Sequence, residues 1–143
     1  MTTWLLDVNV LVALTWPSHV HHEQTHAWFA AVAHRPWATC ALTQLGFVRV
    51  SSNAKMTADA VDVPSALNAL ALLVAAPGHA FWDDAPAVLD LGVFRDTTLT
   101  GHRQLTDAYL ACVAQRHGGR LATLDRSLGR WAASARLPVD LVG

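Results

Sequence analysis

The chain has 143 residues, of which 52% are apolar and 15% charged, and its formal net charge is −1 at pH 7. This length suits one globular domain, and the composition excludes a disordered or collagen-like chain. The longest apolar runs fall short of the ~18 residues that a membrane helix needs, and no basic group precedes an apolar run at the N-terminus. We therefore expect a cytoplasmic protein with no membrane association.

Apolar runs of strand length alternate along the chain with longer segments of helical periodicity. Pro17 ends the first helix, Pro64 and Pro86 fit a first helical turn, and Gly118 ends a later helix. In chain order, we predict a strand with Leu5 and Leu6 that ends at Asp7, helices over 8–14 and 20–32, a strand over 37–40, a helix over 43–50, a loop over 53–63, a helix over 64–76, a strand over 80–82, a helix over 86–94, a loop over 97–101, a helix over 105–117, a strand over 121–124, a helix over 127–135 and a strand over 138–142.

This alternation predicts an α/β fold. We expect one three-layer α/β/α domain over residues 1–143, built on a central parallel sheet of about five short strands. Crossovers in such sheets are right-handed, so the carboxyl ends of all strands point to one edge. Ligand sites lie along that edge. Polar residues that follow a strand are therefore the candidates for a functional site.

The charges are unevenly distributed. Residues 1–94 hold 3 Lys or Arg and 7 Asp or Glu, a balance of −4, whereas residues 95–143 hold 7 Arg and 4 Asp, a balance of +3. Arg forms paired hydrogen bonds with phosphates, so the basic C-terminal part could contact RNA or an acidic peptide. A set of solvated helix faces explains the same charges.

The tryptophans and cysteines are predicted to be mostly structural. Cys40 and Cys112 lie far apart in apolar segments, which favours two buried free thiols in a reducing cytoplasm and leaves a disulfide open. Trp16, beside Pro17, is the best candidate for an interface residue. Four other tryptophans fall at predicted core positions: Trp4, Trp28, Trp82 and Trp131.

Three aspartates are expected at the carboxyl edge of the sheet. Asp7 ends the first strand, Asp125 ends the fourth, and Asp107 lies in the first turn of the helix before the fourth strand. Each could simply cap a helix. Three together would repel one another and raise each other's pKa, a cost that a divalent cation relieves. Oxygen ligands without His or Cys suit Mg²⁺ or Mn²⁺, which can activate water against a phosphate.

Four short motifs in this order resemble those of the PIN-domain ribonucleases, and in particular the VapC toxins of bacterial toxin–antitoxin pairs. Together they span almost the whole chain. The motifs are Trp4-Leu5-Leu6-Asp7-Val8-Asn9, Gly46-Phe47-Val48-Arg49-Val50, Leu105-Thr106-Asp107-Ala108-Tyr109-Leu110 and Leu121-Ala122-Thr123-Leu124-Asp125.

The resemblance implies a Mg²⁺- or Mn²⁺-dependent endoribonuclease that acts as a toxin and cleaves RNA with metal-activated water. Asp7, Asp107 and Asp125 would be its catalytic, metal-binding carboxylates, and Asn9 and Thr123 would orient them. A helix-end hydrogen bond for Asn9 and a buried strand hydroxyl for Thr123 are equally open. The resemblance also implies a VapB-type antitoxin as partner and a homodimer.

One position departs from the family pattern. PIN domains usually carry a Glu in the helix after the second strand, where this chain has Gln44, and Glu23 is its only Glu. A Gln carbonyl can ligate a hard cation or its water but adds no charge. We expect a weaker metal site that retains activity. Arg49, on the same helix, is a candidate for an RNA or acidic contact, although a lone helical Arg is more often solvated.

A rival motif lies in the second predicted helix. His22-Glu23-Gln24-Thr25-His26 matches the H-E-x-x-H signature of zinc proteases. Such a site needs a third ligand. Phe29 and Val32 stand where the extended form has Gly and His, and no downstream Glu follows. A polar helix face that binds Zn²⁺ or Ni²⁺ adventitiously is the better interpretation.

The leading alternative to the nuclease is not an enzyme. A catalytically degenerate PIN-like binding module would use its aspartates only as helix caps. RNA cleavage that is lost in EDTA would indicate the nuclease, peptide cleavage restored by Zn²⁺ would indicate the protease, and neither would indicate the module.

Overall fold

The computed structural model describes residues 2–32, 35–83, 85–95 and 104–143. In these ranges the strands are β1 (Trp4–Leu6), β2 (Trp37–Cys40), β3 (His79–Trp82), β4 (Arg120–Thr123) and β5 (Val139–Leu141). The α-helices are α1 (Val8–Thr15), α2 (His22–Ala31), α3 (Ala41–Ser51), α4 (Val63–Val74), α5 (Leu105–Arg116) and α6 (Arg126–Ala135).

The strands form one parallel sheet in the order β3-β2-β1-β4-β5. The first strand lies at its centre, where Trp4 pairs with Trp37 of β2 on one side and with Arg120 of β4 on the other. The residues that follow β1 and β4 therefore meet at the carboxyl edge, where ligands bind in sheets of this kind.

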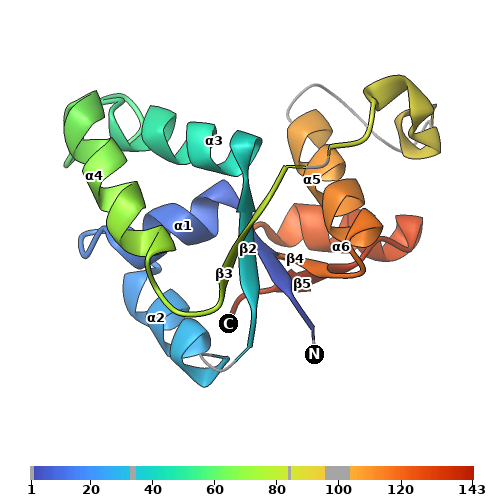
Figure 1. Ribbon diagram of the computed structural model, residues 1–143, viewed down its shortest axis with the longest axis horizontal. Coiled ribbons are helices and arrows are strands. Elements are labelled where there is room, and N and C mark those ends of the chain that lie inside the picture. The colour runs from blue at the N-terminus through green and yellow to red at the C-terminus, as the bar shows by residue number, and fades with distance from the viewer. Residues whose placement is uncertain (1, 33–34, 84, 96–103) are drawn as a thin grey trace.

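Helices cover both faces of the sheet, as Figure 1 shows: α1 to α4 lie on one side, and α5 and α6 on the other. Successive β1 side chains enter different cores, because side chains alternate along a strand. Leu5 packs in the cluster that includes α5 and α6, whereas Leu6 packs in the cluster that includes α1 and Phe47 of α3. Both leucines are fully buried. The predicted α/β/α fold with five short parallel strands is confirmed.

Most predicted elements are present with boundaries shifted by at most two residues, but the helix predicted over 86–94 is wrong. Two short 3-10 turns stand there, η1 (Val88–Asp90) and η2 (Gly92–Arg95). Leu89 is 82% exposed, and neither turn buries a residue. A helix this short needs an apolar face docked on a core, and Gly92 weakens it further. The loop predicted over 97–101 lies outside the described residues.

The predicted core tryptophans are buried or pack against the two clusters, and both cysteines are buried and free. Trp16 is the tryptophan predicted at an interface. Its ring stacks on Phe47 at a centroid distance of 6.3 Å, and its Nε1 donates to Ser51 Oγ at 2.9 Å. One face of Trp16 therefore packs on α3 within the chain, and the interface role expected for it stays a prediction. Among the described residues, no helix is long and apolar enough to cross a membrane.

Candidate active site

Asp7 is the most buried carboxyl group at the carboxyl edge of the sheet, with 3% of its surface exposed. It follows β1 and caps α1, since its Oδ1 accepts from the Val8 N–H at 2.7 Å. Its Oδ2 accepts from the Thr123 hydroxyl of β4 at 2.8 Å. The carboxylate is thus held on both oxygens, once by the helix it begins and once by the neighbouring strand.

Asn9 and Thr123 connect the ends of β1 and β4. Asn9 donates from Nδ2 to Thr123 Oγ1 at 3.2 Å, and its Oδ1 accepts from the Leu124 N–H at 3.1 Å. Thr123 Oγ1 also accepts from the Asp125 N–H at 3.1 Å. Because these bonds use the acceptor capacity of the hydroxyl, its one proton is directed at Asp7. Both residues predicted to orient the site contact its strand ends.

The electrostatics separate the aspartates. Burial raises the pKa of Asp7, and the charge of Asp125 adds to this against the lowering effect of its hydrogen bonds. The pKa of Asp107 is raised to about 7, first by burial and then by the charges of Asp7 and Asp125. Carboxylates that lie close enough to raise one another's pKa form an arrangement that a bound cation stabilises.

Asp125 behaves differently. Its Oδ1 caps α6, accepting from the Ser127 N–H at 2.9 Å, the Ser127 hydroxyl at 2.7 Å and the Leu128 N–H at 3.2 Å. Burial raises its pKa, but the bonds from Ser127 and Leu128 and the charge of Arg130 outweigh it, so the net shift is downward. The expectation that all three pKa values are raised is therefore wrong for Asp125, because a helix start stabilises its charged form.

A cavity of about 330 Å³ opens beside this edge of the sheet. Asp7, Asn9 and Asp107 line it together with His19 and Met56. Asp125 is not part of its lining. Within the described ranges, no three His, Cys, Asp or Glu side chains gather closely enough to form a metal site by themselves. The cavity therefore presents a pair of carboxylates, with the third close enough to act through its charge.

His19 was missed as a site residue by the sequence reasoning. It belongs to none of the motifs found in the sequence, yet it lies in the turn between α1 and α2 and lines the same cavity as Asp7 and Asp107. The signal available in the sequence was its position just before the second helix, rather than within it.

Gln44 and Arg49 lie apart from the cavity lining. Gln44 is half-buried on α3 and donates from Nε2 to Thr39 Oγ1 at 3.0 Å. Thr39 in turn lies 2.7 Å from His79 Nε2. Arg49 is exposed near the end of α3. No bond between described residues joins either side chain to the three aspartates, so their roles at the site remain predictions.

The H-E-x-x-H motif holds two helices together. His22 Nδ1 lies 2.7 Å from the carbonyl oxygen of Ala13, and His26 Nε2 lies 2.8 Å from that of Leu14. These carbonyls belong to the last turn of α1, where the helix has no backbone donors of its own to offer them. The two imidazoles therefore cap α1, which accounts for their i, i+4 spacing without a metal.

Comparison with known proteins gives an independent view of the chain. The family described as PIN domain matches residues 4–133. Ribonuclease VapC39 of Mycobacterium tuberculosis (strain ATCC 25618 / H37Rv) is 41% identical over 138 residues, covering 96% of this chain and 99% of that protein. Ribonuclease VapC38 of the same strain is 44% identical over 139 residues, covering 96% of each.

A solved structure shows the same arrangement of elements. The crystal structure of PAE2754 from Pyrobaculum aerophilum matches this chain with a TM-score of 0.60 and 25% sequence identity. The match covers 99% of this chain and 90% of that one.

Proposed function

This chain belongs to the PIN-domain family, and from that membership we propose that it is a metal-dependent endoribonuclease acting as the toxin of a toxin–antitoxin pair. Its reaction is the hydrolysis of an RNA phosphodiester bond by water. We take residues 1–143 as one domain, since a single sheet joins strands from Trp4 to Leu141.

The observation that carries the proposal is the fixed Asp7 carboxylate facing the same cavity as Asp107. A helix-capping role alone does not require Asp7 and Asp107 to line the same cavity, where their charges repel. The hydrogen bonds of Asp125 are those of a helix cap, but its charge still raises the pKa values of Asp7 and Asp107. No described contact favours the degenerate module or the zinc protease.

The donor set fits a hard divalent cation. Mg²⁺ keeps several of its waters and is often bound through only one or two carboxylates, so a full cage of protein ligands is not required. Asp7 and Asp107 would hold the ion, and the charge of Asp125 would add to its attraction. Bound there, Mg²⁺ or Mn²⁺ would supply the positive charge that lowers the pKa of water and stabilises a phosphate in the transition state.

The protein's own residues prepare this site. Thr123 and Asn9 fix the orientation of the Asp7 carboxylate before substrate arrives, which removes the need to order it during the reaction. Asp107, whose pKa lies near neutrality, can take up or release a proton at its carboxylate around pH 7 in the absence of metal.

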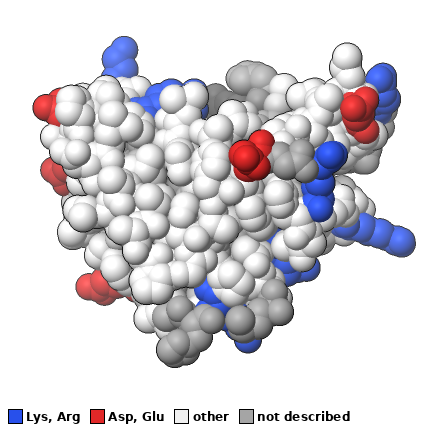
Figure 2. Space-filling view, viewed as in Figure 1, with Lys and Arg blue, Asp and Glu red and all other residues white. Residues whose placement is uncertain are grey.

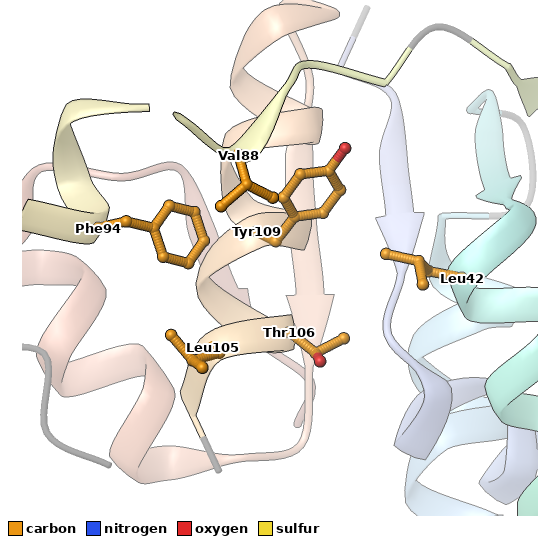
Figure 3. Close-up of a pocket in the computed structure, with 6 residues that line it drawn as sticks. All are labelled: Leu42, Val88, Phe94, Leu105, Thr106 and Tyr109. Carbon is orange, nitrogen blue, oxygen red and sulfur yellow. The ribbon is translucent and has the colours of Figure 1, made fainter. Parts of the chain in front are cut away.

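Apolar surface is the observation behind the two protein partners that we propose, an antitoxin and a second copy of the chain. Much of the face in Figure 2 carries no charged side chain, and exposed apolar residues include Leu45 at 68% and Leu72 at 78%. An apolar cavity of about 290 Å³ lies between α3 and α5; Figure 3 shows Leu42 on one side and Leu105 and Tyr109 on the other. We propose an antitoxin segment in this cavity and a homodimer through the apolar surface, both in the cytoplasm.

The test is RNA cleavage by the purified protein with millimolar Mg²⁺ and with EDTA. Asp7→Asn keeps a side chain that caps helices nearly as well as Asp but removes the charge that binds metal. We expect the wild type to cleave only with Mg²⁺, and Asp7→Asn to lose at least 100-fold in rate. Asp59→Asn, which removes the same charge at an exposed loop position, is the matched control.

Expression in bacteria tests the toxin role separately. The wild type should slow growth, whereas Asp7→Asn should not, with equal amounts of both proteins in the cell. Cleavage that persists in EDTA, or equal toxicity of the two proteins, would contradict the proposal.

A further inference from the structure

The cavity beside Asp7 is lined by side chains of different chemistry. Asp7 and Asp107 contribute carboxylates to its lining, His19 contributes an imidazole and Met56 an apolar side chain. An RNA strand whose scissile phosphate lies at the carboxylates must continue in some direction from there. His19 is a lining residue that carries no negative charge, so it does not repel a second phosphate.

The turn that carries His19 is well defined. The His19 N–H donates to the Trp16 carbonyl at 3.0 Å, and the His19 carbonyl accepts from the His22 N–H at 3.0 Å. Trp16 is itself held against Phe47 and Ser51 of α3. The imidazole is therefore attached to a backbone that packing fixes at both sides.

The tautomer of the His19 ring follows from one further contact. Its Nδ1 lies 3.0 Å from the backbone N of His21. A backbone N–H can only donate, so Nδ1 is the acceptor and the proton of the neutral ring is on Nε2. Burial and the neighbouring His21 and His22 lower the pKa of His19, which keeps the ring neutral. No described residue accepts from Nε2.

We propose that His19 is a substrate-binding residue, whose Nε2–H donates a hydrogen bond to a phosphate oxygen of the nucleotide next to the scissile bond. The proposal rests on the ribonuclease function proposed above. A neutral imidazole donor suits this position, because it binds one acceptor without adding a positive charge that would compete for the carboxylates. His19 thereby sets where the strand runs from Asp7 and Asp107.

The test uses an inactive background, so that binding is measured without cleavage. In Asp7→Asn, the affinity for a fluorescein-labelled, random-sequence single-stranded RNA of about 12 nucleotides is measured by fluorescence anisotropy in Mg²⁺. Adding His19→Leu should weaken binding about tenfold, as expected for one lost hydrogen bond to a charged group. His19→Gln, which keeps an N–H donor, should stay within about threefold. His21→Ala, outside the cavity lining, should have no effect.

A second arm identifies the acceptor. The same variants are titrated with an oligonucleotide of the same length in which abasic residues replace the nucleotides. If the acceptor is a phosphate oxygen, the tenfold weakening caused by His19→Leu persists with this oligonucleotide. Its disappearance would overturn the phosphate assignment, and equal affinities of the His19→Leu and His19→Gln variants would overturn the proposal.

Two further measurements keep the proposal falsifiable. In the otherwise wild-type enzyme, His19→Leu should raise KM about tenfold and change kcat by less than about twofold, whereas Asp7→Asn abolishes kcat. If His19→Leu does not fold, a second measurement replaces it. In the Asp7→Asn variant, which keeps His19, the ¹⁵N resonance of His19 Nε2 is followed during titration with RNA. A shift larger than that of His21 is expected, and no shift would refute the assignment. A failed ribonuclease function would instead appear as a wild type that neither binds nor cleaves RNA.

Discussion

At the scale of single residues, local contacts decide which carboxylates are primed for a cation. Asp125 receives three hydrogen bonds from the start of α6, so its charged form is stabilised. Asp107 receives no hydrogen bond from another described residue and feels two like charges, which with burial raises its pKa to about 7. In the metal-free site, Asp107 is therefore the carboxylate whose charged form is most destabilised by burial and by repulsion from its neighbours.

We predict that Asp107→Asn melts higher than the wild type in EDTA at pH 8. The folded-state pKa of about 7 exceeds the unfolded value of 3.8, so the folded protein binds the extra proton between these pH values and this group's contribution to stability falls as pH rises. Solvent screens a partly exposed charge, so we expect ~1 kcal/mol, or ~2–4 °C. The measurement is thermal melting of both proteins at pH 4 and pH 8, and the difference should vanish at pH 4.

Millimolar Mg²⁺ should reverse this order at pH 8, because the wild type gains binding free energy that the variant lacks. Asp59→Asn is the control for charge removal in general. Its difference in melting temperature from the wild type should be the same with and without Mg²⁺. An equal Mg²⁺ shift for the wild type and Asp107→Asn would remove Asp107 from the metal site.

Gln44 supplies a second prediction at this scale. Its amide donates to Thr39, in the strand that neighbours β1. Gln44→Glu cannot make that donation and adds a carboxylate near the carboxyl edge, so we expect Mg²⁺ affinity to rise several-fold, measured by isothermal titration calorimetry. Gln115→Glu adds the same charge at an exposed position of α5 and should leave it unchanged. Equal affinities of all three proteins would place Gln44 outside the site.

At the scale of elements, the close packing of α1 on α3 holds Asp7 in place. An added Cβ at Gly46 of α3 would lie 2.5 Å from Val8 Cγ2, which is closer than real contacts allow. Val8 is the first residue of α1 and follows Asp7 directly. The absence of a side chain at Gly46 is thus what allows the helix that Asp7 caps to approach α3.

We predict that Gly46→Ala lowers stability despite the higher helix propensity of Ala. Overpacking costs ~1–3 kcal/mol, while Ala gains at most about 1 kcal/mol over Gly within a helix. Urea unfolding measures the net loss. Val8→Ala removes the clashing methyl groups, so the double variant should be less destabilised than the sum of the two single variants. If the losses in unfolding free energy simply add, the side chain added at position 46 does not clash with Val8.

At the scale of the whole molecule, the sheet is fastened at the edge opposite the site. Asp140 of β5 accepts from Trp4 Nε1 of β1 at 3.0 Å and from Arg120 Nε and Nη2 of β4 at 2.8 Å each. One carboxylate thus joins three strands. Its pKa is lowered, because the bonds from Arg120 and Trp4 outweigh the effect of burial, which raises it.

We predict that Asp140→Ala lowers the free energy of unfolding by about 1 kcal/mol at pH 7, a modest value because the pair is partly exposed. A lowered folded-state pKa contributes stability above the unfolded value of 3.8 and loses it as pH falls below that value. The difference from the wild type in urea unfolding should therefore shrink below about pH 4. Mg²⁺ affinity should not change. A loss of Mg²⁺ affinity in Asp140→Ala would mean that this edge of the sheet is coupled to the edge with the aspartates.

The sequence by itself determined the alternation of elements and the family. Strands such as Trp37–Cys40 are short, mostly apolar runs, and such local patterns can be recognised in the sequence alone. It also predicted that Asp7 and Asp107 lie at one edge of the sheet, because parallel topology sends every strand end to that edge, and both line one cavity there. The helix predicted over 86–94 is wrong because Gly92 weakens it and neither short turn there buries a residue, which periodicity alone does not show.

Only the tertiary structure decided what each polar side chain faces. Asp125 has the sequence position of a metal ligand but the hydrogen bonds of a helix cap, and His22 and His26 have the spacing of zinc ligands but bond to the carbonyls of α1. His19 carries no motif, yet the turn after α1 places it in the cavity of Asp7. Direction and distance between groups far apart in sequence depend on how the helices pack, and no local pattern encodes them.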